Sequence, residues 1–332
     1  MEIREIGVGD EPAVRRHWEI GKQVMEYRRP WNWYWAWESA WATIQLKSRE
    51  FERTLLAAFD GGRMEGTAWI GYPLLDNKHS AFLDVMVPPD GRLRGVGSAL
   101  CAHAEGLVSG RGRRTVMAEV IVGIDEVDSP GMAFAEHRGY TMGVSDGMKV
   151  VDLFETEPTW AGLVAETEPH HASYRLVTWL DRMPDELVEG YCALQEAFNT
   201  QAPMGELDVE PEVWDLDRVR GREEIGRKAG AHEVATAAVA ADGSMAGVTE
   251  VYISDFTPQR GQQSGTIVTP AHRGHRLGLA VKLANHQAVR ARFPDCQRLI
   301  TGNADVNEHM NAVNDALGFR LVEHCHELQK KL

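Results

Sequence analysis

One arrangement of residues occurs twice in this sequence and constrains the fold more than any other feature. The two copies read "VMVPPDGRLRGVGSALCAHAEGLV" and "VTPAHRGHRLGLAVKLANHQAVR". Each starts as an apolar run typical of a β-strand, passes through Pro and a turn rich in Arg and Gly, and continues with a helical pattern. A long internal repeat of this kind predicts two similar structural units in one chain.

The elements expected around the two turns also recur in the same order. A short strand, a helix that begins near Pro12 or Pro184, and a hairpin at "DGG" or "DG" precede each turn. Asp-Gly between β-rich runs is a strong hairpin signal. A buried strand and a helix that stops at Gly139 or Gly318 follow each turn. The fold class predicted is α/β (α+β), with a mixed, mostly antiparallel sheet flanked by helices in each half.

An acidic, Pro-containing stretch, "FETEPTWAGLVAETEPHH", separates the two sets of elements. Its weak periodicity places the boundary between the two halves there, around residue 160. We therefore expect an N-terminal domain over residues 1–160 and a C-terminal domain over 161–332, which suits the chain length of 332 residues.

Composition excludes several classes of function. The net charge of −14 argues against nucleic acid or an anionic membrane as a partner, because phosphate binding needs concentrated positive charge. The start of the chain lacks a signal-peptide core, and no run of about 18 apolar residues occurs. The four cysteines are too far apart for a zinc site or a dense disulfide framework: Cys101, Cys192, Cys296 and Cys325. We expect a cytoplasmic protein without a metal, as a monomer or homodimer.

The repeated turn predicts an anion site. A Gly-rich turn that opens a helix presents unpaired backbone N–H groups at the positive end of the helix dipole, and arginines add charge-assisted hydrogen bonds. Neither turn has the Gly-Lys-Ser/Thr of a Walker loop. A dinucleotide fingerprint fits only in part, because Leu100 replaces its third small residue and an antiparallel meander precedes the turn.

A third interpretation fits both halves. The spacing Arg-x-x-Gly-x-Gly at Arg92, Gly95 and Gly97 resembles the pyrophosphate loop of the GNAT superfamily of acyl-CoA-dependent N-acyltransferases. The second copy resembles that loop with one departure, Arg276 in place of Gly. The order of elements in both halves is similar to the GNAT order, so the resemblance covers nearly the whole chain and indicates two tandem GNAT domains.

The resemblance implies acetyl-CoA as the acyl donor and a small, amine-bearing acceptor, without a covalent enzyme intermediate. The acidic net charge is compatible with a cationic acceptor. The resemblance assigns acetyl-CoA contacts to two groups of residues. Those of the second half are Val268, Thr269, Arg273, Gly274, His275, Arg276, Leu277, Gly278, Leu279, Asn303 and Asn307. Those of the first half are Val87, Arg92, Leu93, Arg94, Gly95, Val96, Gly97 and Ser98. An N-cap role is the alternative for Asn307.

Two residues of the second half are the catalytic candidates. Glu250, on the middle strand of the meander, can serve as the base that takes the proton of the amine, or can be an ordinary exposed strand residue. Asn314 stands where many family members have the Tyr that protonates the leaving thiolate, and Ala135 stands there in the first half, so the general acid is open in both. The Asn-rich stretch favours the C-terminal half as catalytic. The first half has Asp84 and Glu119 on neighbouring strands. A non-catalytic acyl-CoA-binding or regulatory protein is the alternative.

A tryptophan-rich stretch, "RRPWNWYWAWESAW", has no counterpart in the second half. Trp33, Trp37 and Trp41 are four residues apart and would share one helix face, which favours packing within the domain. An aromatic wall for a cationic acceptor is the alternative.

Overall fold

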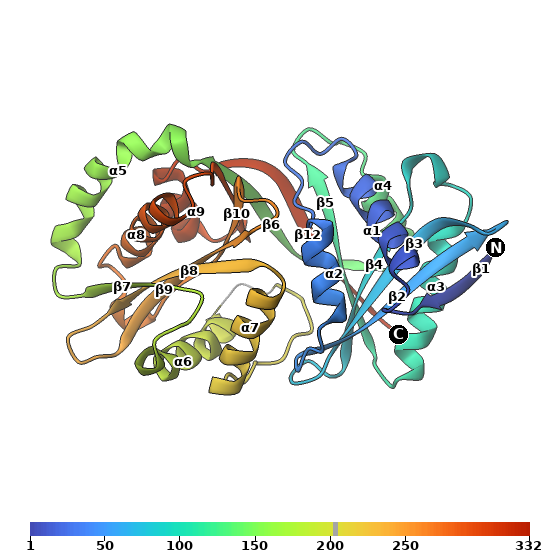
Figure 1. Cartoon of the computed structure of the whole chain (residues 1–332), viewed down its shortest axis with the longest axis horizontal. Helices are drawn as coiled ribbons and strands as arrows, with labels where there is room; N and C mark the ends of the chain where they lie inside the picture. The colour runs from blue at the N-terminus through green and yellow to red at the C-terminus, as the bar shows by residue number, and fades with distance from the viewer. Residues whose placement is uncertain (202–204) are drawn as a thin grey trace. The chain divides into compact units, whose positions relative to one another are not determined.

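The computed structural model describes residues 1–201 and 205–332. These residues form two compact units, which we call unit 1 and unit 2 (Figure 1). Of the described residues, unit 1 contains 1–145, 205–210 and 323–332, and unit 2 contains 146–201 and 211–322. Each unit has a mixed sheet with helices on both faces, so the predicted fold class is confirmed.

The sheet of unit 1 is built mostly from the first 123 residues. Its strands, in spatial order, are β1 (Glu2–Ile6), β2 (Phe51–Asp60), β3 (Arg63–Pro73), β4 (Ser80–Met86), β5 (Thr115–Gly123) and β12 (Arg320–Lys331). The β4–β5 pair is parallel and the others are antiparallel. Its helical segments are α1 (Glu11–Glu26), α2 (Trp37–Gln45), the 3-10 turn η1 (Pro89–Gly91), α3 (Val96–Gly110) and α4 (Pro130–His137).

The sheet of unit 2 repeats this plan. Its strands, in spatial order, are β6 (Thr141–Asp152), β11 (Arg298–Ala304), β10 (Arg260–Val268), β9 (Met245–Ser254), β8 (Ala231–Val239) and β7 (Arg175–Leu180). Its helical segments are α5 (Leu153–Thr167), η2 (Glu168–His170), α6 (Asp185–Gln201), α7 (Leu216–Lys228), η3 (Pro270–His272), α8 (Leu277–Arg292) and α9 (Glu308–Ala316). Helices α6 and α7 lie on one face of the sheet, and α5, α8 and α9 lie on the other (Figure 1).

Unit 1 takes one strand from the distant end of the chain, whereas the first strand of unit 2 lies at the start of that unit's own sequence. In unit 1, β12 pairs with β5 from Glu323↔Gly123 to Lys331↔Thr115. In unit 2, residues 146–152 of β6 pair with β11. The expected division at residue 160 falls inside unit 2, whose described residues begin at Asp146, and each compact unit is made of separate stretches of sequence.

The stretch expected to hold the domain boundary forms the helix α5. Leu153 and Trp160 are buried, and Leu163 and Val164 pack beside them against the core of unit 2. Pro158 lies inside the helix, where it removes one backbone hydrogen bond, yet the apolar face still has helical spacing. In the sequence, Pro158 and the acidic residues hide this apolar face.

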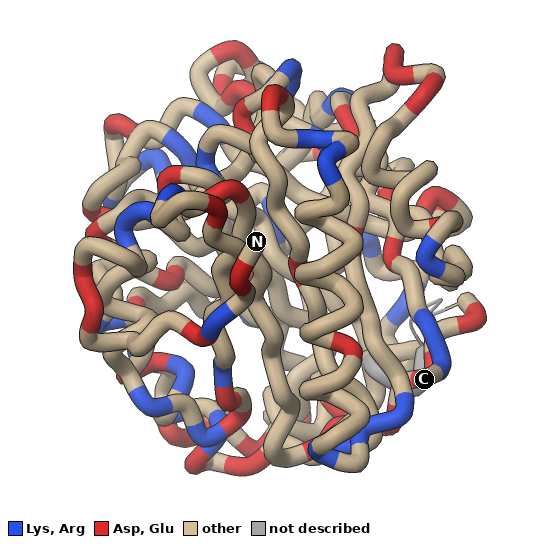
Figure 2. The backbone as a smooth tube through the Cα atoms, turned by 90° about the vertical axis from the view of Figure 1, so that its right-hand side faces the viewer, with Lys and Arg blue, Asp and Glu red and all other residues tan. Residues whose placement is uncertain are grey.

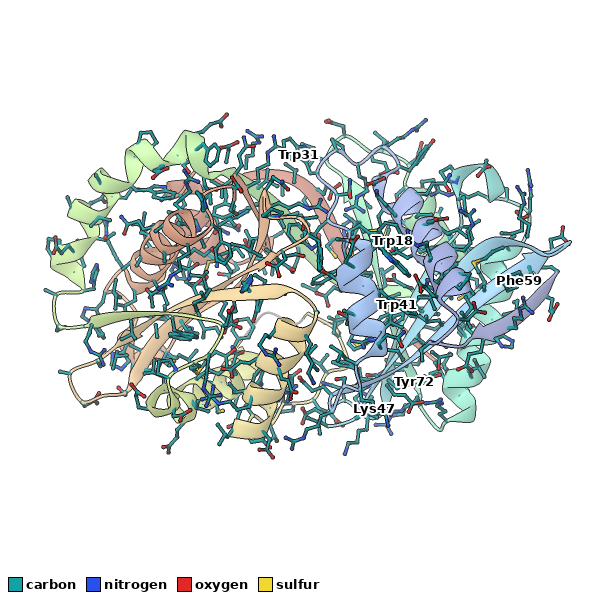
Figure 3. All side chains as sticks on the ribbon, viewed as in Figure 1. Trp18, Trp31, Trp41, Lys47, Phe59 and Tyr72 are labelled. Carbon is teal, nitrogen blue, oxygen red and sulfur yellow. The ribbon has the colours of Figure 1, made fainter. Side chains whose placement is uncertain are left out.

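The tryptophan-rich stretch packs within unit 1. Trp37 and Trp41 stack with ring centroids 5.4 Å apart, and Trp18 of α1 contacts Trp37 edge-on. Figure 3 shows Trp18 and Trp41 on the two helices that cover this face of the sheet. Trp33 precedes the first residue of α2, so the expected helix face of three tryptophans is reduced to two.

Candidate functional site

The two Arg/Gly loops have the same backbone geometry. Each holds two residues in the left-handed region, Leu93 and Gly95 in unit 1 and Gly274 and Arg276 in unit 2. The following helices, α3 and α8, have no side chain that caps their first N–H groups and no acidic residue in their first turn. Free N–H groups at a helix start suit a phosphate, so both loops fit the diphosphate of an acyl-CoA.

The arginines of the two loops differ in their surroundings. Arg276 forms an ion pair with Glu166 of α5, and His275 contacts the carbonyl of His170 at 3.2 Å. In unit 1, Arg92 Nε donates to the carbonyl of Val87 at 3.3 Å. Within the described ranges, neither Arg92 nor Arg94 has a carboxylate in ion-pair contact. The loop of unit 1 therefore keeps more positive charge available to an anion.

The strands before and after each loop pair only at one end. The β4–β5 ladder stops at Phe82↔Met117, although both strands continue beyond it. The β10–β11 ladder likewise stops at Gln262↔Ile300. Parallel strands that separate in this way leave backbone N–H and C=O groups open between them. In unit 2, β10 also has a bulge between Gln263 and Thr266, which β4 lacks.

A pocket of about 360 Å³ lies in unit 1 beside the point where β4 and β5 separate. Strands β2, β3, β4, β5 and β12 all contribute to it, as does Leu207. Its acidic residues are Asp84, Glu119 and Glu327, and its basic residue is Arg53. The aromatic lining residues are Phe51, Trp69 and Phe82.

Two carboxyl groups of this pocket, Asp84 and Glu119, have raised pKa values. Burial, followed by the negative charge of Glu119, raises the pKa of Asp84 to about 6. Burial also raises the pKa of Glu119. Burial raises the pKa of the Tyr34 hydroxyl, and the negative charge of the nearby Asp84 raises it further. A carboxylate that titrates near neutral pH suits a general base.

Glu250, the base predicted from sequence, lies in a closed environment. It is 5% exposed, on the face of the unit 2 sheet that α6 and α7 cover. Its Oε2 accepts a hydrogen bond of 3.4 Å from the hydroxyl of Tyr252, and its Oε1 has no hydrogen-bond partner. Burial raises the pKa of Glu250, and also of Glu233 nearby. Glu250 is therefore not the exposed strand residue that was the alternative.

The asparagines of unit 2 form a buried polar network with two lysines. Asn314 accepts from Lys282 Nζ at 2.6 Å and donates to Asn303 Oδ1 at 2.8 Å. Asn303 donates to Asn311 Oδ1 at 2.9 Å, and Asn311 also accepts from Lys149. Burial, followed by the charge of Lys149, lowers the pKa of Lys282 to about 7.

The remaining predicted contacts lie around the loops. Asn307 caps α9 by accepting from the N–H of Met310 at 3.2 Å, as its alternative role required. The N–H of Thr269 already donates to the carbonyl of Ala246 at 2.9 Å, so this N–H is not open to a ligand. Val87 directly follows β4, and Val268 is the last residue of β10; these strands lead into the two loops.

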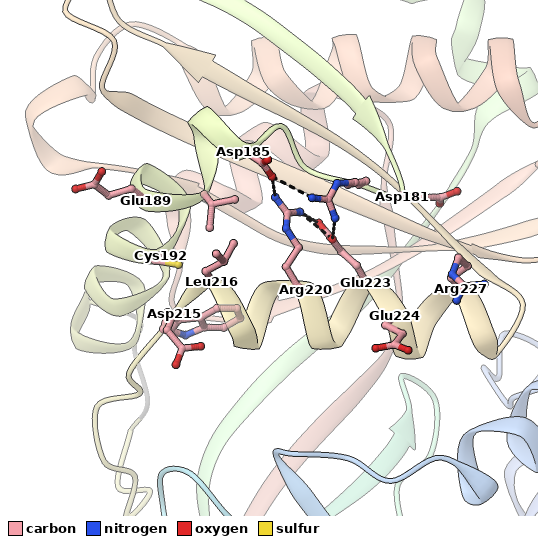
Figure 4. Close-up of a pocket in the computed structure, with 13 residues that line it drawn as sticks. Asp181, Asp185, Glu189, Cys192, Asp215, Leu216, Arg220, Glu223, Glu224 and Arg227 are labelled. Atoms are coloured by element: carbon pink, nitrogen blue, oxygen red, sulfur yellow. Dashed lines mark hydrogen bonds and ion pairs between the residues drawn. The ribbon is translucent and has the colours of Figure 1, made fainter.

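The larger cavity, about 950 Å³, is a groove between α6 and α7 (Figure 4). Asp185 and Glu223 both pair with Arg220 there. The groove contains none of the predicted site residues.

Acidic and basic residues are both spread over the backbone (Figure 2), and residues 183–217 include ten acidic residues without Lys or Arg. In the described part of the chain, no helix is long and apolar enough to cross a membrane. No group of three or more metal-ligating side chains occurs among these same residues.

The comparisons with known proteins agree with this architecture. A model of the acetyltransferase (GNAT) family matches residues 21–140. No curated protein sequence matches the chain significantly. A solved tandem GNAT protein from the clavulanic acid biosynthesis pathway is 26% identical, with 99% of this chain and 98% of that chain covered and a TM-score of 0.81.

Two further structures share the fold. A GCN5-related N-acetyltransferase from Sphaerobacter thermophilus is 14% identical, with coverage of 99% and 95% and a TM-score of 0.65. A glucosamine N-acetyltransferase region of a fungal β-N-acetylglucosaminidase is 13% identical, with 99% of this chain and 38% of that chain covered and a TM-score of 0.68.

The N-terminal half thus carries an acetyltransferase (GNAT) domain, and the chain as a whole is similar in fold to a tandem GNAT protein. Both statements confirm the resemblance found in the sequence. A GNAT fold implies acyl transfer from an acyl-CoA.

Sequence reasoning missed part of the pocket in unit 1. Asp84 and Glu119 were recognised as carboxylates on neighbouring strands. Arg53, Leu207 and Glu327 were not, because they come from three distant stretches of sequence. The only available signal for Arg53 and Glu327 was a charged residue inside a predicted strand.

Proposed function

We propose that this protein is an acetyl-CoA-dependent N-acyltransferase that acylates the amine of a small molecule, and that the acceptor binds in the pocket of unit 1. The observation that carries the proposal is Asp84, a carboxylate with a pKa of about 6 in a pocket beside the separating strands β4 and β5.

Acetyl-CoA would bind along the loop and the start of α3. The backbone N–H groups of Val96, Gly97 and Ser98 have no capping side chain, and Arg92, Leu93, Arg94 and Gly95 complete the loop. The Cβ that a larger residue would add at Gly97 meets Phe134 at 3.5 Å, an ordinary contact, so this Gly is not required for packing. Its role in the proposal is to let the diphosphate approach the backbone.

Acetyl-CoA supplies an activated acyl group: the amine nitrogen forms a bond to the acyl carbon, the C–S bond breaks, and CoA leaves as the thiolate. The amine must lose a proton to become nucleophilic. Asp84 would take this proton, and Glu119 raises its affinity for it. The aromatic walls Trp69 and Phe82 would exclude water from the reacting atoms.

Unit 2 is proposed as a second acyl-CoA site. Its loop residues Arg273, Gly274, His275, Leu277, Gly278 and Leu279 would surround the diphosphate, and Val268, Thr269, Asn303 and Asn307 would lie along the rest of the molecule. The sequence favours this half as catalytic, with Glu250 as base and Asn314 in the place of the acid. We favour unit 1 instead, because Arg276 is paired with Glu166 and Glu250 lies outside any described pocket.

One experiment separates the two halves. Thiol release from acetyl-CoA is followed with a panel of primary amines and the full chain. Asp84→Asn should lower kcat about 100-fold or more, with Glu250→Gln as the matched carboxylate-to-amide control and little changed. The reverse pattern would restore the C-terminal half as the catalytic one.

The alternative of a non-catalytic acyl-CoA-binding protein has its own outcome in the same experiment. Acetyl-CoA would bind in a calorimetric titration, no amine would provoke thiol release, and neither variant would alter binding. Unit 2, with its paired Arg276, is the part of the chain to which this alternative applies best.

A further inference from the structure

The pocket of unit 1 has opposite charges at its two ends. Residues paired across a ladder share one face of the sheet, and the ladders place Arg53, Gly71, Phe82 and Met117 in one row across β2 to β5. Trp69 and Asp84 are paired in the next row. Arg53 thus lies two strands and one row from Asp84, which puts their Cα atoms roughly 12 Å apart.

Arg53 lines the pocket without a carboxylate partner. Its Nη1 donates to the carbonyl of Thr43 at 3.3 Å, and no ion pair joins it to another residue of the described ranges. Burial lowers the pKa of its guanidinium. A partly buried guanidinium with donors to spare is a site for a carboxylate, because charge-assisted and bidentate hydrogen bonds offset its lost hydration.

The surface between these charges is apolar. Gly71 has no side chain, and a Cβ there would lie 2.8 Å from Cη2 of Trp69, so the indole ring covers this position. Phe51 and Phe82 contact each other with ring centroids 6.1 Å apart. Aromatic rings in this place suit methylene groups of a ligand.

We propose that the acceptor of unit 1 is an amino-carboxylate, with its amine at Asp84 and its carboxylate on Arg53, joined by several methylene groups over Trp69. The inference rests on the proposed function, since it names the acceptor of the same site. Asp84, Glu119 and Glu327 outnumber Arg53, so the pocket as a whole still attracts the ammonium form that arrives from water.

Binding of acceptor analogues to the full chain tests this without acyl transfer. The probes are ω-amino acids from glycine to 6-aminohexanoate, and for each length the alkylamine without the carboxylate, titrated by calorimetry or ligand-observed NMR. We expect the longer ω-amino acids to bind at least 10-fold more tightly than their alkylamines, and glycine to show no such preference.

Variants locate the two ends of the ligand. Arg53→Gln should remove the preference for the carboxylate and leave alkylamine binding unchanged, while Arg53→Lys should restore part of it. Arg16→Gln removes an exposed arginine that is paired with Glu19, and it serves as the matched control. If Arg53→Gln does not fold, the comparison of the two probe series on the unaltered chain decides alone.

The outcomes are separate from those of the proposed function. Equal binding of ω-amino acids and alkylamines at every length would overturn the inference, even if amines are acylated. Preferential binding of the longer ω-amino acids without any thiol release from acetyl-CoA would support the inference and contradict the proposed function.

Discussion

Gly95 and Arg276 occupy the same left-handed backbone position in the two loops, with φ of 81° and 52°. The other left-handed position is held by Leu93 in unit 1 and by Gly274 in unit 2. Each loop therefore has Gly at only one of two strained positions, and at opposite ones. The departure of the second loop from the Arg-x-x-Gly-x-Gly spacing is a relocation of the glycine rather than its loss.

We expect the protein to become more stable when the non-glycine residue at the left-handed position of either loop is replaced by Gly. Leu93 is fully exposed, so Leu93→Gly removes left-handed strain without losing packing and should raise stability by about 0.5–1 kcal/mol. Arg276→Gly should gain less, because it also loses the ion pair with Glu166. Thermal unfolding of both variants measures the effect, with Gly9→Ala as a control outside the loops. A lower Tm for Leu93→Gly would contradict the strain argument.

Asp84 gives a pH-dependent prediction for stability. Its pKa in the folded chain, about 6, lies above the ordinary value of 3.8, so folding disfavours the ionised form. The loss of folding stability caused by ionised Asp84 is absent below pH 3.8 and fully present above about pH 6. Asp84→Asn should raise Tm at pH 8 by a few degrees, and this gain should shrink as the pH falls toward 4. An unchanged Tm difference across this range would show that Asp84 titrates normally.

A buried ion pair ties the last strand to unit 1. Arg29 Nε and Nη2 each donate to the carboxylate of Glu323 at 2.8 Å, and the two side chains are 10% and 3% exposed. Glu323→Gln leaves the guanidinium buried without its counter-charge and should cost about 3 kcal/mol. Thermal unfolding followed by tryptophan fluorescence reports the loss. Glu19→Gln removes an exposed pair with Arg16 and should cost under about 1 kcal/mol.

The contribution of Lys282 to stability should have the opposite dependence on pH. Burial and the charge of Lys149 lower its pKa from 10.5 to about 7, so between these values the unfolded chain binds more protons than the folded one and stability rises with pH. Lys282→Met removes this dependence. It should raise Tm at pH 7, and the gain should fall toward pH 10. The exposed Lys228→Met is the control, and an equal gain at both pH values would exclude a shifted Lys282.

Much of the fold could be predicted because its signals are local. The hairpin turns, the Gly that ends each last helix, and the repeated loops are all short motifs whose geometry depends on residues close in sequence. The pairing of β12 with β5 could not be predicted, since the choice of a strand's partner depends on contacts about 200 residues apart. Helix α5 was not recognised in the sequence, because Pro158 and nearby acidic residues hid an apolar face of helical spacing.

The candidate site was predictable only in part. The loop residues follow from the repeated spacing, but alternation along a strand does not say which face is open. Glu250 and Asp84 both sit in strands of mixed polarity, and only packing shows that α6 and α7 close over Glu250 while Asp84 borders a pocket. Arg53 and Glu327 come together with Asp84 through ladders that no local pattern encodes.

The placement of β12 in unit 1 also reverses the order in which the two units can be completed during synthesis. All the described stretches of unit 2 lie between residues 146 and 322, whereas unit 1 needs residues 323–332. As the ribosome makes the chain from its N-terminus, β5 exposes an unpaired edge for about 200 residues of elongation. The half that is translated first is therefore the half that finishes folding last, and its pocket acquires Glu327 only at that final step.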